Sequence, residues 1–334
     1  MFVQIRHHSL VDTPLPEAAS LSTSRANACA HFDRIGSNLS RQQAYRFRVW
    51  TFAVGIFADA AFLFRYDRSG CQVSERIDYS TELGNRQLTA FFLRLDRMAD
   101  DPEARGWDPT VSDPSKQEIK CFSDLVKSVC EGKPESERMV TRGKKKKTES
   151  GPGTNPFFRR LVQGVGDPDG YPRKKLSVMD GEVSRDYIVG RPTTIPEATI
   201  GRSTRAFVAM SVETKKLVLL KDTWRINSTD IISEDHCYKR LVSKKSRSGV
   251  KNIGAYLHGS DVYARKQIVR CSDMKQRTIA HHYARDFGQK RTIDYIHYRM
   301  IQPELYISVY TFKDSKHLTS IMLGIARGGF FSFT

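Results

Sequence analysis

Between residues 45 and 80, apolar runs separated by polar turn positions predict β-strands. Residues 45–57 (YRFRVWTFAVGIF) and 61–67 (AFLFRYD) are rich in aromatic and β-branched residues, and turn-forming positions near Asp59 and at 67–70 separate the runs. Residues 71–79 (CQVSERIDY) continue the pattern. Together the three runs predict an antiparallel meander with one partly solvated face.

Two amphipathic helices are predicted after the meander, because apolar residues recur there with a helical period. Residues 84–99 carry the apolar face of the first helix, formed by Leu88, Phe91, Phe92, Leu95 and Met98. Residues 114–131 carry that of the second, formed by Ile119, Phe122, Val126 and Val129.

The flanking segments lack such periods. Residues 1–40 are predicted to be a mobile or loosely packed arm, and residues 132–155 read as a basic linker with four consecutive lysines at 144–147. The lysine run fits a nuclear import signal, a nucleic-acid contact or a solvated insert. We therefore expect four parts: an N-terminal arm (1–40), an α+β module (41–131), the linker (132–155) and a second domain (156–334).

A β-hairpin is predicted over residues 199–225. Residues 208–212 alternate, residues 213–216 form a polar turn, and residues 217–220 give an apolar second strand. A helix should follow, capped by one of residues 228–230, with Ile231, Tyr238, Leu241 and Val242 on one face. Glu234 falls on this apolar face, where a carboxylate needs a partner, and Lys221 is the candidate. The alternative is that Glu234 reaches solvent at the edge of the face.

Short strands are also predicted on either side of the hairpin, at 187–189, 253–259, 261–270 and 297–301. A last helix is expected over 315–326, with its end at Gly328-Gly329.

Composition limits the classes of protein. Of 334 residues 39% are apolar, enough for a core, and the net charge of +17 favours polyanionic partners such as nucleotide or nucleic acid. The six cysteines form no C-x-x-C pair, so no zinc site is predicted. No apolar run approaches a membrane span, and we expect an intracellular protein, cytoplasmic or nuclear, with reduced thiols and no membrane contact.

The hairpin also carries candidate phosphate-binding chemistry. Protein kinases cover the ATP phosphates with a G-x-G-x-x-G-x-V loop and place a lysine on the third strand. Gly201, Ser203, Ala206 and Val208 stand at the corresponding loop positions, and Lys221 ends the second strand. Two glycines are replaced by small residues, which weakens close approach to phosphate without preventing it.

These segments resemble the fungal-type protein kinases, whose loop reads GRGT and is followed by a Lys-Asp-x-Trp-Arg turn. This chain has GRST at 201–204 and KDTWR at 221–225. The family's N-terminal module has an Arg-Trp-Asp-Arg-Ser-Gly strand end and a Gly-x-Asp-x-Thr-Val segment, which read RYDRSG at 65–70 and GWDPTV at 106–111 here. The resemblance implies an α+β chain with a kinase-like small lobe, and 297–301 as its fifth strand with a hinge at 302–306. It also implies ATP-dependent Ser/Thr phosphorylation as the family activity, with Gly201, Ser203, Val208, Lys221 and Glu234 toward the nucleotide.

The parts that perform phosphoryl transfer are not found in the sequence. Asp286-Phe287-Gly288 spells the kinase metal-binding triplet, but no H-R-D-x-x-x-x-N loop precedes it and it comes before the hinge candidate. We therefore read it as a polar turn. The expectation is a truncated form or pseudokinase that binds ATP weakly, with no catalytic residue, no supported Mg²⁺ site and an exposed apolar lobe face suited to a protein partner.

The alternative is a basic nucleic-acid- or protein-binding module without catalysis. The charge surplus favours it, although the basic residues are spread over many segments. Salt dependence separates the two readings, because phosphate-driven binding to nucleic acid weakens steeply as salt rises.

Overall fold

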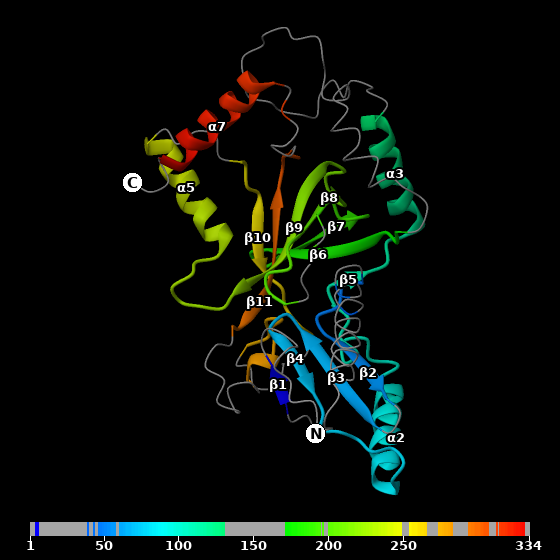
Figure 1. The fold of residues 1–334 in the computed structure, drawn as a ribbon. Helices are drawn as coiled ribbons and strands as arrows, with labels where there is room; N and C mark the ends of the chain where they lie inside the picture. Colours follow the sequence, from blue (N-terminus) through cyan, green and yellow to red (C-terminus); the bar gives the residue numbers. More distant parts are fainter. Residues whose placement is uncertain are drawn as a thin grey trace.

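The chain folds into an α+β structure built on two antiparallel sheets (Figure 1), so the α+β class predicted from the sequence is confirmed. The structure is a computed structural model, and it describes residues 4–6, 39, 43, 46–57, 60–130, 171–194, 196, 200–248, 254–265, 273–282, 293–306, 312 and 314–330. The predicted linker at 132–155 with its lysine run, most of the predicted arm and the Asp286–Gly288 turn lie outside these residues.

The predicted meander forms the first sheet. Its strands are β2 (Thr51–Ile56), β3 (Ala61–Asp67) and β4 (Gly70–Val73), and β1 (Gln4–Arg6) pairs with β4 to give the order β1-β4-β3-β2. β1 lies in the segment for which no regular structure was expected. Pairing along a free sheet edge uses backbone groups, so it does not require an apolar period in the added strand.

Both predicted helices are present, but they pack on different sheets. α2 (Glu82–Arg97) is capped by the Thr81 hydroxyl and lies on the first sheet, where Leu88 and Phe91 contact the apolar cluster around Leu63. α3 (Lys116–Cys130) instead packs Phe122 and Val126 against the second sheet. The sequence predicts α3 as part of the N-terminal module, but in the structure this helix covers part of the second sheet.

The second sheet has seven strands. They are β5 (Val111–Ser112), β6 (Lys174–Asp180), β7 (Val183–Val189), β8 (Arg205–Ser211), β9 (Leu217–Ile226), β10 (His258–Asp261) and β11 (Tyr295–Gln302). Their order is β10-β11-β9-β8-β7-β6-β5. The two-residue strand β5 comes from the predicted N-terminal module and pairs with β6. The segment 106–112, which the sequence assigned to the N-terminal module, therefore contributes a strand to the second sheet.

The second sheet is curled, so that strands near its two ends meet. The Tyr187 hydroxyl on β7 lies 2.7 Å from Nε2 of His258 on β10, and Nδ1 of His258 lies 3.3 Å from the carbonyl oxygen of Met179 on β6. The curl encloses the largest core cluster, which consists of Phe47, Leu176, Val178, Tyr187, Val189, Phe207, Ala209, Val218, Leu220 and Ile301.

Helix α5 (Glu234–Ser248) follows β9, and α7 (Ser315–Phe330) follows β11. Residues 280–282 are also helical. The predicted break at Gly328-Gly329 is wrong, because α7 continues through both glycines. They fall in its last turns, where a cost of about 1 kcal/mol per glycine does not end the helix.

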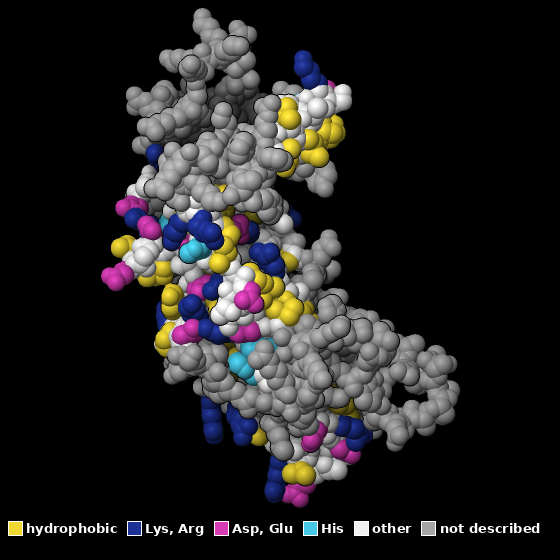
Figure 2. All heavy atoms as spheres, turned by 90° about the vertical axis from the view of Figure 1, so that its left-hand side faces the viewer, with side chains coloured by type: hydrophobic (Ala, Val, Ile, Leu, Met, Phe, Trp, Pro, Cys, Tyr) yellow, Lys and Arg dark blue, Asp and Glu magenta, His cyan; other side chains and the backbone are white. Residues whose placement is uncertain are grey.

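α7 presents apolar side chains to solvent. Met322, Leu323 and Ile325 are each about half exposed or more, and Figure 2 shows hydrophobic side chains gathered at the height of this helix. Among the described residues, no helix is both long enough and apolar enough to cross a membrane.

Candidate functional site

The candidate site is organised by an ion pair between the second sheet and α5. Lys221 Nζ lies 2.6 Å from Oε2 of Glu234, and each side chain keeps between 25% and 29% of its surface exposed. The sequence expectation that Glu234 pairs with Lys221 is therefore confirmed. A pair exposed to this extent remains within reach of a ligand.

The strands fix the side of the sheet on which this pair lies. Lys221 on β9 stands opposite Ala206 on β8 and Met300 on β11. Paired residues of antiparallel strands project to the same face, so all three share one face with Val208, two residues beyond Ala206. This is also the face that carries α5.

Hydrogen bonds to β11 hold α5 on that face. The Asp235 backbone N–H donates to the Tyr298 hydroxyl at 3.0 Å, and the Gln302 side-chain amide donates to the Tyr238 hydroxyl at 3.1 Å. Because β11 pairs with β9, these bonds fix the first turn of α5 beside Lys221. Glu234, the first residue of the helix, is positioned by this anchoring.

The predicted start of this helix is wrong by one turn. Ile231 lies before α5 and is 47% exposed, so it is not part of the buried face. The Ser228 hydroxyl accepts from the Asp230 N–H in a local turn, and the first helical bond runs from Cys237 N–H to the Ser233 carbonyl. A polar side chain that bonds its own backbone competes with helix formation, which explains the delayed start.

The glycine loop at 201–204 contains two residues with positive φ. Gly201 has φ +106° and Ser203 has φ +41°, both in the left-handed region. Gly201 adopts this conformation without cost, whereas a serine does so only when its surroundings hold it there. The Gly201 N–H donates to the Arg68 carbonyl at 2.8 Å, and Arg68 donates to the Ser203 hydroxyl at 2.9 Å. The loop is thus in direct contact with the N-terminal module.

Val208 is placed differently from the other candidate residues. It is fully buried in a cluster with Ile188, Met210, Phe122 and Val126, the last two from α3. Helix α3 therefore covers the part of the shared face that carries Val208, and Lys221 and Glu234 lie farther along it. The structure brings Lys221 and Glu234 together and leaves Val208 beneath a helix.

On the opposite face, the GWDPTV segment enters a buried network of charges that sequence reasoning did not find. Arg299 on β11 donates to Asp108 Oδ2 at 2.5 Å, to the Thr110 hydroxyl at 2.7 Å and to Asp222 Oδ1 at 3.2 Å. Asp222 also accepts from Arg205 and lies 2.5 Å from Nε2 of His297. The His297 ring stacks on Trp224 with ring centres 4.7 Å apart.

The two buried carboxylates of this network, Asp108 and Asp222, are stabilised in their charged form by the cations beside them. Burial alone would raise the pKa of Asp108, but Arg299 and His297 outweigh burial and hold that pKa below its usual value. Burial acts in the same way on Asp222, where Arg205, His297 and Arg299 keep the pKa well below its usual value. Both carboxylates therefore stay ionised although they are buried. The network joins the N-terminal module to the second sheet.

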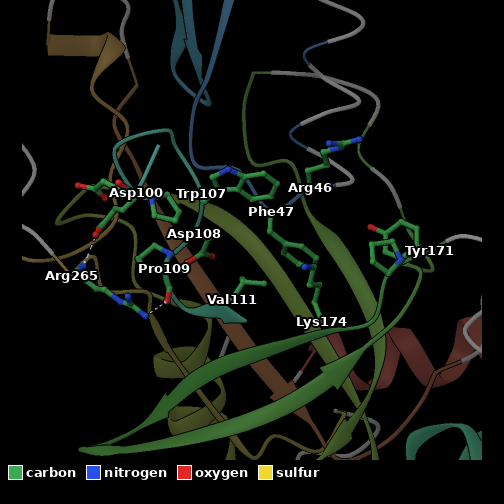
Figure 3. A pocket seen from close by; sticks show the side chains of 14 residues that line it. Arg46, Phe47, Asp100, Trp107, Asp108, Pro109, Val111, Tyr171, Lys174 and Arg265 are labelled. Atoms are coloured by element: carbon green, nitrogen blue, oxygen red, sulfur yellow. Dashed lines mark hydrogen bonds between the residues drawn. The ribbon is translucent and has the colours of Figure 1, made fainter. Parts of the chain in front are cut away.

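A separate cavity of about 830 Å³ opens near β5 and β6 (Figure 3). Its walls include three aromatic side chains, Phe47, Trp107 and Tyr171, and the cations Arg46, Lys174 and Arg265. Lys174 pairs with Asp113, and Arg265 donates to the Pro109 carbonyl. None of the five sequence-predicted nucleotide residues lines this cavity.

The described residues contain no cluster of three or more His, Cys, Asp or Glu side chains that could hold a metal ion. Neither a scan against protein-family models nor comparisons with curated proteins and solved structures gives a match to this chain. The fold and the site geometry define an α+β protein with two antiparallel sheets, in which a buried ionic network ties the segment after α2 to the second sheet.

Proposed function

We propose that this chain is a non-catalytic relative of the fungal-type protein kinases, a kinase-like small lobe that binds nucleotide weakly and carries a docked N-terminal module. The observation that carries the proposal is the Lys221–Glu234 ion pair at 2.6 Å. In the run β7 to β11, Lys221 lies on the third strand and Glu234 on the helix that follows it. Protein kinases arrange the lysine that contacts the ATP phosphates and its glutamate partner in this way.

The residues of the candidate site support nucleotide binding and do not support phosphoryl transfer. The Lys221 ammonium would contact nucleotide phosphates as a point charge, and Glu234 would orient it. Phosphoryl transfer also needs an aspartate beside the acceptor hydroxyl and side chains that hold Mg²⁺, and the sequence contains no H-R-D-x-x-x-x-N loop to supply them. We therefore propose ATP as a weakly bound ligand and assign no catalytic residue.

The packing of α3 on the second sheet supports a low affinity of this site for nucleotide. In the kinase loop motif the valine follows the phosphate-binding glycines, and here Val208 is buried under Phe122 and Val126. A nucleotide that reached Lys221 could not also contact Val208 unless α3 moved away. Such a nucleotide would gain phosphate contacts without the apolar contact at Val208.

The experiment that tests the proposal is ATP-induced thermal stabilisation, measured with and without Mg²⁺. We expect millimolar ATP to raise the melting temperature of the wild type, because a ligand that binds only the folded state stabilises it. Lys221→Ala and Glu234→Gln should lose the shift. Lys239→Ala is the matched control, since Lys239 forms an exposed ion pair with Asp235 on the same helix. An equal shift in Lys221→Ala, or no shift in the wild type, would contradict the proposal.

Polyanion binding is the second candidate, and the net charge of +17 is the observation that favours it. It would appear as binding of single-stranded RNA or DNA that weakens steeply between 50 and 200 mM salt, by at least about tenfold for several phosphate contacts. Lys221→Ala should leave this binding nearly unchanged, because it removes one charge among many. Fluorescence anisotropy with a labelled oligonucleotide measures both effects.

A further inference from the structure

The turn at 65–70 of the N-terminal module contacts two separate segments of the second domain, residues 279–281 and the loop at 201–204. Asp67 Oδ2 accepts from the backbone N–H groups of Ile279 and Ala280 at 2.8 and 2.9 Å, and the Ser69 hydroxyl accepts from His281 N–H at 3.1 Å. Asp67 and Ser69 therefore fix the turn against residues 279–281. Both side chains are buried, so water does not compete for these bonds.

Arg68, between these two anchors, reaches the glycine loop. Its carbonyl accepts from Gly201 N–H at 2.8 Å, and its guanidinium donates to the Ser203 hydroxyl at 2.9 Å. The anchors on either side leave Arg68 little freedom to move. The same residue thus bonds both loop positions that have positive φ.

The burial of Arg68 explains why its guanidinium bonds the Ser203 hydroxyl. Arg68 is buried, and burial together with the nearby Arg205 lowers its pKa to about 9, while Asp222 and Asp67 act in the opposite direction. A buried guanidinium needs hydrogen-bond acceptors, and the Ser203 hydroxyl is one of them. Ser203 in turn keeps an unfavourable backbone conformation, which persists only where surrounding contacts hold it.

We propose that Arg68 is a positioning residue for the loop at 201–204, so that docking of the N-terminal module sets the conformation of the candidate phosphate-binding loop. The effect on the loop itself stands on the hydrogen bonds and the backbone angles. The consequence for nucleotide affinity rests on the proposed function. A chain in which Arg68 no longer contacts the loop would keep the Lys221–Glu234 pair and lose the ordered loop.

Amide hydrogen exchange of the full chain tests the proposal without any nucleotide. Arg68→Met removes the donor at similar length, and Ser203→Ala removes the acceptor. Each should raise exchange at the amides of residues 201–204 by about tenfold, the change expected when a hydrogen bond to a charged group is lost. The double variant should exchange no faster than either single one, because both remove one interaction. Arg86→Gln is the control, since Arg86 forms an exposed pair with Glu82 on α2.

The outcomes are distinct. Exchange that stays at the wild-type rate in a folded Ser203→Ala variant would overturn the proposal, and this variant decides the matter if Arg68→Met does not fold. The ATP-induced rise in melting temperature of the same variants tests the consequence for nucleotide affinity. We expect a smaller rise in Ser203→Ala than in the wild type. Faster loop exchange in a protein that binds no ATP at all would keep the positioning role and remove only the proposed function.

Discussion

Asp108 and Arg299 form a buried ion pair at 2.5 Å although 191 positions of sequence separate them. Asp108 lies between α2 and β5 and Arg299 lies in the middle of β11, so the pair ties the segment that follows α2 to the second sheet. The pair does not stand alone, because Arg299 also bonds Asp222 and the Thr110 hydroxyl. A charge removed at either end leaves its partner buried without compensation.

Loss of this pair should destabilise the whole chain. We expect Asp108→Asn to lower the free energy of unfolding by about 3–5 kcal/mol, because it leaves the Arg299 guanidinium partly unpaired in a buried site. Urea denaturation measures the loss. The exposed pair of Arg86 and Glu82 is the comparison, and Arg86→Gln should cost less than about 1 kcal/mol. Equal midpoints for the two variants would show that the network contributes nothing to stability.

Gly106 should tolerate no side chain. Its φ is +86°, and an added Cβ would stand 2.2 Å from the Trp50 carbonyl oxygen. We expect Gly106→Ala to cost more than about 2 kcal/mol, because a steric clash adds to the backbone strain. Gly181→Ala is the matched control, since Gly181 has φ +63° and nothing within 4 Å of an added Cβ. It should cost only about 1 kcal/mol, and thermal melts of both variants would test the difference.

The stability of the chain should fall as pH is lowered through the titration range of histidine. Burial lowers the pKa of His258 below its usual value of 6.5. The unfolded chain therefore takes up a proton at a higher pH than the folded chain, and the stabilisation present above pH 6.5 is lost below it. We expect His258→Gln to show a smaller fall in urea midpoint between pH 8 and about 5.5 than the wild type.

Helix α3 should depend on a single aromatic anchor. Phe122 is 1% exposed between α3 and the second sheet, and Phe122→Ala should cost about 3–5 kcal/mol. Phe92 on α2 is 46% exposed, so Phe92→Ala is the control and should cost less than half as much. Denaturant midpoints compare the two. If Phe122→Ala matched its control, α3 would be a weakly attached helix and not a cover for Val208.

Local patterns predicted the elements that are long and periodic. The apolar run at 61–67 and the alternation at 208–212 predicted strands, which the structure places at 61–67 and 205–211, and the apolar stripes predicted α2 and α3 within two residues at each end. The Lys221–Glu234 pair could also be predicted, because only 13 positions separate its members and both lie in recognisable elements. Period and short-range spacing are properties of the sequence itself.

The contacts between distant segments could not be predicted in the same way. Arg68 and Ser203 are 135 positions apart, and neither stands out by hydrophobic pattern. The strand β5 has two residues, too few for any period, and its partner lies beyond residue 170. The only signals were the RYDRSG and GWDPTV segments, whose likeness to a family module marked them without saying what they touch. Their partners depend on how the two sheets are brought together in space.

The interleaving of the two sheets has a consequence for synthesis on the ribosome. The groups that Asp67 and Asp108 need, the backbone amides of residues 279 and 280 and the side chain of Arg299, lie 212, 213 and 191 positions farther along the chain. Until these residues have emerged, the growing chain holds carboxylates and a strand edge with no native partner. The native contacts of Asp67 and Asp108 therefore form only after residue 299 has been synthesised, and the segment that carries them is exposed for longer than an independent domain would be.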